Sequence, residues 1–217
     1  MPLNLYGHPF SSYTWKALIP LYAHQVPFEF RSLEEVSIEE AQFVQDASPQ
    51  GKFPVLVDAE RTIFEATSII EYLALHYLPD AGLVPSDPDA SLQVRMMDRV
   101  FDNYVMNLMQ EGVNEAIRTS GQPDPAVMAE VRRRLERTYA WLDHWLGDYR
   151  RPSQVTLIEC AAAPSLFYAD WVHRIGEQWP RLKNWRAHLL AIPAVSRCVE
   201  DARPYRPNFP LGAPERD

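Results

Sequence analysis

The sequence predicts an N-terminal α/β domain over residues 1–80 and an all-α C-terminal domain over residues 92–217. Strand and helix signals alternate over the first part, in the order β-α-β-α-β-β-α. Between them, residues 80–91 are rich in turn formers and lack periodicity. A β-α-β unit implies parallel strands and two closely spaced strands imply a hairpin, so we expect a mixed four-stranded sheet.

In the N-terminal part, the first strand candidate is Leu3–Tyr6, a short apolar run. Ser11 and Ser12 then precede a segment with apolar residues at helical spacing, and Pro20 is expected to bend that helix or loosen its last turns. The remaining candidates are a strand at 28–30, a helix at 38–44, strands at 55–57 and 62–64, and a helix opening at 65.

In the C-terminal part, three helix starts can be read from local signals. Asp124 offers an N-cap and Pro125 a first helical residue. Thr156 and Glu159 have capping-box spacing, and Pro193 opens a further helix. The proline-rich last dozen residues are expected to form an irregular tail.

The amino-acid composition of the chain limits the classes of binding partner that we expect. The net charge is −8 and the pI is near 5.3, which argues against nucleic acid or an anionic membrane surface as a partner. The basic cluster of Arg132, Arg133, Arg134 and Arg137 lies among glutamates and is interpreted as a solvated face. We expect no membrane span and no signal peptide, because no apolar run is long enough and the first strand begins at Leu3. The expected location is the cytoplasm.

The two cysteines, Cys160 and Cys198, are far apart and form no Cys-x-x-Cys pair. Both lie in apolar, helix-like surroundings. We therefore expect buried, inert thiols, with neither a disulfide nor dithiol chemistry.

The most informative stretch runs from Lys52 through the helix that begins at Glu65. Pro54 precedes a Val-Leu-Val strand, and a proline there removes an N–H donor from the hydrogen-bond ladder of the sheet. If the peptide bond before Pro54 is cis, the neighbouring backbone turns outward, where a peptide can pair with it. Glu65 can accept from an amine, and the free N–H groups of the following helix start suit a carboxylate. Together they fit a small peptide with a free amino-acid end, such as glutathione.

Several motifs, in this order along the chain, resemble those of the cytosolic glutathione transferase family. They are Leu5-Tyr6, Phe10–Tyr13, Lys52–Val57, Glu65–Leu73 and Thr156–Pro164. The resemblance implies a thioredoxin-like N-terminal domain that holds glutathione, a helical domain that supplies an electrophile pocket, and a homodimer. The segment from Ser11 to Lys16 is similar to the zeta-class signature Ser-Ser-Cys-x-Trp-Arg, but Tyr13 replaces its cysteine. That departure argues against maleylacetoacetate isomerase activity.

The function implied is activation of the glutathione thiol for attack on a small hydrophobic electrophile, a step in detoxification. Glutathione is then a co-substrate, and no metal is expected. Two alternatives stay open. The first is a related glutathione-dependent reaction, as in an isomerase, peroxidase or dehalogenase, and the second is a non-catalytic binding or interaction protein with the same fold.

Ser11 is the preferred donor to the thiolate, because the anion is the nucleophile and must be stabilised near neutral pH. Lowering a thiol pKa by ~2 units requires ~2.7 kcal/mol, and one hydroxyl bonded to a charged acceptor supplies roughly 1.5–3 kcal/mol. Ser12 is the main rival, with Tyr6 and Thr14 as further alternatives. Plain N-capping is the ordinary role of serines at this position.

The resemblance also assigns the rest of the glutathione site. Glu65 would accept from the γ-glutamyl ammonium, and the N–H groups of Ala66 and Thr67 would bind its carboxylate. The family usually has serine where this chain has Ala66, so weakened binding is expected. The cysteinyl unit would pair with backbone beside Pro54, namely that of Phe53 and Val55. Lys52 could reach a carboxylate of the ligand or remain solvated.

The electrophile pocket is assigned to Phe10 and Tyr104. The residues from Met96 to Met109 are apolar around much of one helix, which predicts burial on two sides, against the core and against a dimer partner. Asp98 and Asp102 share the polar face of this helix. They are interpreted as surface carboxylates, although the resemblance allows one of them to approach the partner's glutathione.

Overall fold

The structure is a computed structural model that describes residues 3–217. Its first part is a four-stranded sheet in the order β2-β1-β3-β4, with β1 parallel to β2 and β3 antiparallel to both β1 and β4. The mixed sheet expected from the sequence is confirmed. The elements are β1 (Leu3–Gly7), α1 (Ser12–Ala23), β2 (Phe28–Ser32), α2 (Ile38–Asp46), β3 (Val55–Asp58), β4 (Arg61–Phe64) and α3 (Ala66–His76).

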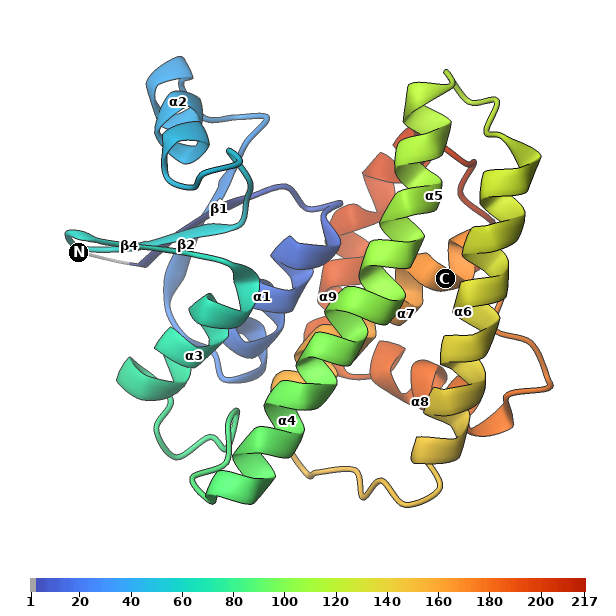
Figure 1. Cartoon of the computed structure of the whole chain (residues 1–217). Coiled ribbons are helices and arrows are strands. Elements are labelled where there is room, and N and C mark those ends of the chain that lie inside the picture. Colours follow the sequence, from blue (N-terminus) through green and yellow to red (C-terminus); the bar gives the residue numbers. More distant parts are fainter. Residues whose placement is uncertain (1–2) are drawn as a thin grey trace.

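Helices cover both faces of this sheet. In Figure 1, α2 lies on one side of the strands, and α1 and α3 lie on the other, toward the helical part. The helix α1 contacts α3, α7 and α9, so it is the element that joins the two parts. It continues past Pro20 to Ala23, so the last turns do not loosen at Pro20, which was one of the two outcomes expected there.

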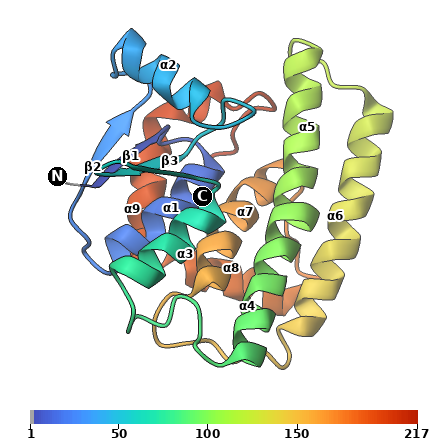
Figure 2. The same ribbon diagram turned by 60° about the vertical axis from the view of Figure 1, so that its left-hand side comes forward.

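The second part consists of helices. They are α4 (Pro88–Phe101), a π-helical turn η1 (Asp102–Met106), α5 (Asn107–Arg118), α6 (Pro125–Trp145), α7 (Leu157–Val172), α8 (Pro180–Leu190) and α9 (Pro193–Ala202), followed by a short 3-10 helix η2 (Arg203–Asn208). Figures 1 and 2 show α4, η1 and α5 as one long helix beside α6. A π turn inside a helix occurs frequently at functional sites. The thioredoxin-like sheet followed by a helical part confirms the predicted fold class.

The helix α7 forms the centre of the helical part, because every one of its residues is buried. Its start agrees with the prediction, since Thr156 and Glu159 form both bonds of a capping box. The starts at Asp124 and Pro193 are also confirmed. Within residues 3–217, no helix is long and apolar enough to cross a membrane.

The C-terminal tail departs from the expectation of an irregular segment. It contains η2, and its Phe209 is buried against the aromatic side chains of Phe10 and Trp171. Arg216 donates to the Asp170 carboxylate at 2.9 Å, which fixes the end of the chain on α7. The reason is that apolar and charged residues among the prolines find partners on the helical part.

Candidate functional site

Ser11 lies at the N-terminus of α1 as its N-cap residue. Its Oγ accepts a hydrogen bond from the Thr14 N–H at 3.3 Å, and its own N–H donates to the His8 carbonyl at 2.9 Å. The residue is half-buried. Accepting the Thr14 bond uses an oxygen lone pair, so the hydroxyl hydrogen remains available to a ligand. Capping and donation to a thiolate are therefore compatible at this residue.

The other candidate hydroxyls are less well placed. Ser12 is buried in the first turn of α1, and Thr14 is fully buried, with its Oγ1 accepting from the His8 N–H. The Tyr6 hydroxyl donates to Glu40 of α2 at 3.4 Å, and burial, followed by the charge of Glu40, raises the pKa of Tyr6. These observations favour Ser11 over its rivals.

The backbone ahead of β3 is free at Phe53. The Phe53–Pro54 peptide bond is cis, and within residues 3–217 no hydrogen bond engages the Phe53 backbone. Val55 lies between Tyr6 of β1 and Phe64 of β4, so the expectation that its backbone offers a free edge is wrong. The physical reason is that β3 is an inner strand of the sheet. Lys52 is exposed, and its N–H donates to Ser48 Oγ at 3.0 Å.

Glu65 occupies a strained position directly before α3. It has a φ of 66° and a ψ of 117°, and its exposed side chain makes no capping bond to the helix. A positive φ is unusual for a residue with a Cβ, and such strain clusters at ligand sites. Within the described chain, the N–H groups of Ala66 and Thr67 have no acceptor, as expected in the first turn of a helix. The turn is therefore suited to bind a carboxylate.

Asp98 and Asp102 are not surface carboxylates, and that interpretation is corrected. The Asp98 side chain is 0% exposed, and the carboxylates of both residues pair with Lys16 of α1. Burial raises the pKa of Asp102, against the opposing effect of Lys16. The sequence reasoning treated Lys16 only as part of a motif. Its position on the buried side of α1, next to Trp15, was the signal that could have revealed the pairing.

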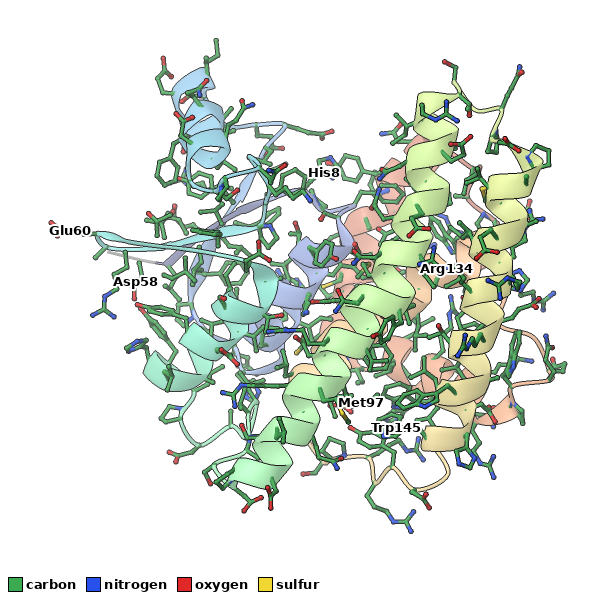
Figure 3. All side chains as sticks on the ribbon, in the orientation of Figure 1. His8, Asp58, Glu60, Met97, Arg134 and Trp145 are labelled. Carbon is green, nitrogen blue, oxygen red and sulfur yellow. The ribbon has the colours of Figure 1, made fainter. Side chains whose placement is uncertain are left out.

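Phe10 does not line the cavity at Tyr104. Tyr104 is 58% exposed and lines a cavity of about 600 Å³ between the α4–α5 helix and α6. Its other lining residues are Val100, Leu108, Arg133, Arg134, Arg137, Thr138 and Trp141. Figure 3 shows Arg134 between these helices. Three members of the arginine cluster expected to be a solvated face thus also line this cavity, and one of them, Arg134, pairs with Glu111 of α5.

Phe10 belongs to an aromatic cluster beneath the Ser11 loop. Its ring packs against Tyr168 at 5.4 Å between centroids, and against Trp171, Tyr205 and Phe209. The Tyr168 hydroxyl donates to the Phe10 carbonyl at 2.8 Å. The cluster holds the loop on α7, which the sequence alone did not indicate.

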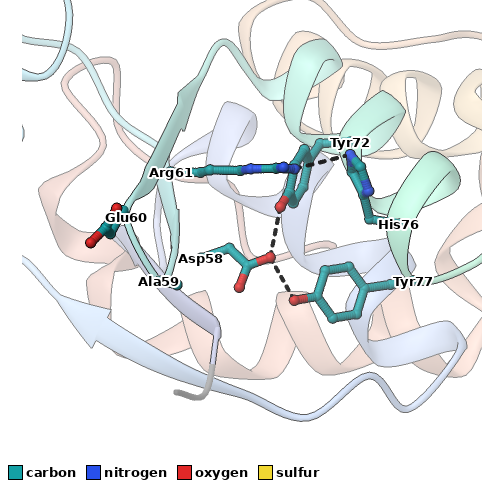
Figure 4. A pocket seen from close by; sticks show the side chains of 7 residues that line it. All are labelled: Asp58, Ala59, Glu60, Arg61, Tyr72, His76 and Tyr77. Atoms are coloured by element: carbon teal, nitrogen blue, oxygen red, sulfur yellow. Dashed lines mark hydrogen bonds between the residues drawn. The ribbon is translucent and has the colours of Figure 1, made fainter.

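A second cavity, of about 760 Å³, lies at the β3–β4 hairpin. Asp58 accepts hydrogen bonds from Tyr72 at 2.6 Å and from Tyr77 at 2.7 Å, and these bonds lower the pKa of its carboxyl (Figure 4). Arg61 and His76 complete the wall. None of the predicted glutathione residues lines it.

Metal-ligating side chains do not gather in the part of the chain that the structure describes. Among residues 3–217, no group of three or more histidine, cysteine or acidic side chains could hold a metal ion. Cys160 and Cys198 are free and buried, as predicted, and burial raises the pKa of both thiols.

Comparison with known proteins identifies the family. Residues 5–79 match the model of the glutathione S-transferase N-terminal domain. Glutathione S-transferase F6 of Arabidopsis thaliana is 24% identical over 210 residues, covering 91% of this chain and 99% of that protein. The chain belongs to the cytosolic glutathione transferase family.

Other members of the glutathione transferase family align over nearly the whole chain. A probable maleylacetoacetate isomerase of Vibrio cholerae is 25% identical, covering 94% of this chain and 98% of that protein. The crystal structure of a glutathione S-transferase from Methylobacterium radiotolerans, in complex with glutathione sulfonate, has a TM-score of 0.74. It is 26% identical and covers 92% of this chain and 95% of that one.

Proposed function

We propose that Ser11 activates the thiol of glutathione for attack on a small hydrophobic electrophile. The matched relatives support a glutathione S-transferase enzyme, and the coarser activity that they support is that of a glutathione-dependent transferase or isomerase. The observation that carries the finer proposal is the half-buried Ser11 hydroxyl, whose hydrogen stays free while its oxygen caps α1. A hydroxyl so placed can donate to the sulfur anion.

The γ-glutamyl end of glutathione would lie at the start of α3. The exposed Glu65 carboxylate accepts from the ammonium, and the N–H groups of Ala66 and Thr67 donate to the carboxylate. The cysteinyl unit pairs with the free Phe53 backbone next to Pro54, and Lys52 is near enough in the chain to meet the glycyl carboxylate. Ala66 retains the N–H and lacks a hydroxyl, so this end binds more weakly than a serine would allow.

We propose that the electrophile enters near Tyr104, with Phe10 shaping the site through the loop that carries Ser11. On the α4–α5 side of the Tyr104 cavity, Val100 and Leu108 form an apolar wall opposite the arginines of α6, and this wall supports a hydrophobic substrate. We also propose that the enzyme works in detoxification in the cytoplasm as a homodimer, with domains over residues 1–80 and 92–217. No metal takes part in this proposal.

A related isomerase activity is the second candidate, since matched relatives include probable maleylacetoacetate isomerases. Tyr13 argues against it. The Tyr13 hydroxyl donates to Asn107 at 3.4 Å and its pKa is raised by burial, so it cannot replace a cysteine thiolate. A non-catalytic binding protein is the third candidate, favoured only by Ala66.

The three candidates are separated by calorimetry with glutathione, followed by a panel of electrophiles: aryl halides, enals, hydroperoxides and isothiocyanates. Binding of glutathione and turnover of at least one electrophile is the expected result. Turnover of maleylacetoacetate alone would establish the isomerase. Binding without any turnover would establish the non-catalytic protein, and absence of binding would contradict the proposal.

A further inference from the structure

Lys16 is a fully buried lysine that binds three side chains, one each from α3, α4 and η1. Its Nζ lies 2.6 Å from Asp98 Oδ1, 2.7 Å from Asp102 Oδ2 and 2.9 Å from Thr67 Oγ1. The side chain is 0% exposed. A lysine is almost never buried so completely unless its charge is paired, and here the ammonium has two carboxylates and a hydroxyl as partners.

The Thr67 hydroxyl links this ion cluster to the first turn of α3. It accepts from Lys16 and donates to Asp98 at 3.0 Å, so both functions of the hydroxyl are engaged. Thr67 is the second residue of α3, and its own N–H has no acceptor within residues 3–217. The side chain therefore points into the cluster and fixes the turn, while the N–H is left for a ligand.

The cluster also fixes α3 relative to α1 and to the long helix. Asp98 lies in the last turn of α4, and Asp102, one turn farther along, is the first residue of the π-helical turn η1. Both carboxylates contact the ammonium of Lys16. Lys16 lies in the middle of α1, whose N-cap is Ser11. One ammonium thus joins the helix that carries the thiol donor to the helix that begins at the carboxylate site.

We propose that Lys16 is a positioning residue for glutathione: through Thr67, it holds the first turn of α3 so that its N–H groups meet the γ-glutamyl carboxylate. This inference rests on the function proposed above. A purely structural role for Lys16 would lower stability and activity together. A positioning role acts on glutathione affinity through Thr67 and leaves the chemical step at saturation intact.

The test measures glutathione binding by calorimetry, together with KM and kcat, in the full-length protein. Thr67→Val removes the hydroxyl and leaves the Lys16 carboxylate pairs in place. The dissociation constant for glutathione and the KM should each rise about tenfold, with kcat within twofold. Thr67→Ser should restore both. Ser165→Ala is the matched control, because it removes a buried hydroxyl bonded only to the Ala162 carbonyl on α7, and its affinity should not change.

A mutant cycle assigns the effect to Lys16. The background for this cycle is the double variant Lys16→Met with Asp98→Asn, which removes one charge of each sign. Adding Thr67→Val to this double variant should change its glutathione affinity by less than twofold. If the double variant does not fold, Thr67→Val and the smaller Thr67→Ala decide the question alone.

Equal affinity of Thr67→Val and the unmodified protein would overturn this inference and leave the proposed function intact. A full tenfold effect of Thr67→Val in the double variant would also overturn it, since Thr67 would then act without Lys16. Failure of the unmodified protein to bind glutathione would overturn both the inference and the proposed function.

Discussion

Tyr168 of α7 donates a hydrogen bond of 2.8 Å to the main-chain carbonyl of Phe10, directly before Ser11. The two rings also meet edge to face, at 5.4 Å between centroids. The loop that carries the proposed thiol donor is therefore held in place by the helical part, although it belongs to the sheet-containing part.

Tyr168→Phe should destabilise the protein while keeping the ring packing. The Phe10 carbonyl would lose its partner in a sheltered position, which costs roughly 1–2 kcal/mol in the free energy of unfolding. Tyr22→Phe is the control, because the Tyr22 hydroxyl bonds Asp201 at an exposed position, and its effect should stay within about 0.5 kcal/mol. Urea unfolding measures both, and equal effects would contradict the role given to the Tyr168 bond.

Replacing Glu65 should separate binding from backbone strain. Both Glu65→Ala and Glu65→Gly remove the proposed acceptor of the γ-glutamyl ammonium, so calorimetry should show a loss of roughly 2–5 kcal/mol in glutathione binding. Glycine tolerates the φ of 66° and alanine does not. The free energy of unfolding of Glu65→Gly should therefore be about 1 kcal/mol higher than that of Glu65→Ala. Unchanged glutathione affinity in both variants would refute the assignment of this site.

Local signals made much of the fold predictable. The capping box of Thr156 and Glu159 and the cap at Asp124 act within one helical turn, so a few neighbouring residues determine them. The mixed character of the sheet followed from the β-α-β unit and the hairpin. For the same reason, Glu65 could be placed at the start of a helix, although its positive φ could not be foreseen.

Contacts between distant segments were not predictable in the same way. The sequence pattern of a polar helix face is the same whether water or a buried lysine covers that face. Asp98 was therefore assigned to the surface, whereas it is buried and pairs with Lys16. The prediction of a free backbone edge at Val55 was wrong for a related reason. Only the pairing of β3 with β1 on one side and with β4 on the other shows that β3 is an inner strand. Such facts depend on tertiary packing.

The helix surface at Leu92 and Met96 should form a dimer contact. These side chains are 67% and 47% exposed and lie one turn apart on α4, with Tyr104 farther along the same helix. Apolar side chains grouped in this way are typical of interfaces. Light scattering at micromolar concentration should therefore report twice the 25.0 kDa mass of the chain.

Met96→Lys should shift that equilibrium toward the monomer. Ile117→Lys, which changes another exposed apolar residue on α5, should leave the dimer intact. A single 25.0 kDa species in the unmodified protein would contradict the expected dimer.

Asp58 should stabilise the fold in a pH-dependent way. Hydrogen bonds from Tyr72 and Tyr77 lower the pKa of its carboxyl in the folded state, so the ionised form is favoured there. The stabilisation is present above the ordinary carboxyl pKa of about 3.9 and is lost as pH falls through the lower folded value. Asp58→Asn should be less stable than the unmodified protein at pH 7, and the difference should fade in strong acid. A difference independent of pH would show that the charge is not responsible.

Ser11 is proposed to stabilise the thiolate of bound glutathione. The most direct test of this role is a pH titration of the ultraviolet absorbance of that thiolate in the unmodified protein, Ser11→Ala and Ser12→Ala. Ser11→Ala should raise the apparent pKa of the bound thiol by ~1–2 units, with glutathione affinity within a few-fold, while Ser12→Ala should titrate like the unmodified protein. A Ser11→Ala variant whose bound thiol titrates at the same pKa as in the unmodified protein would contradict this role of Ser11.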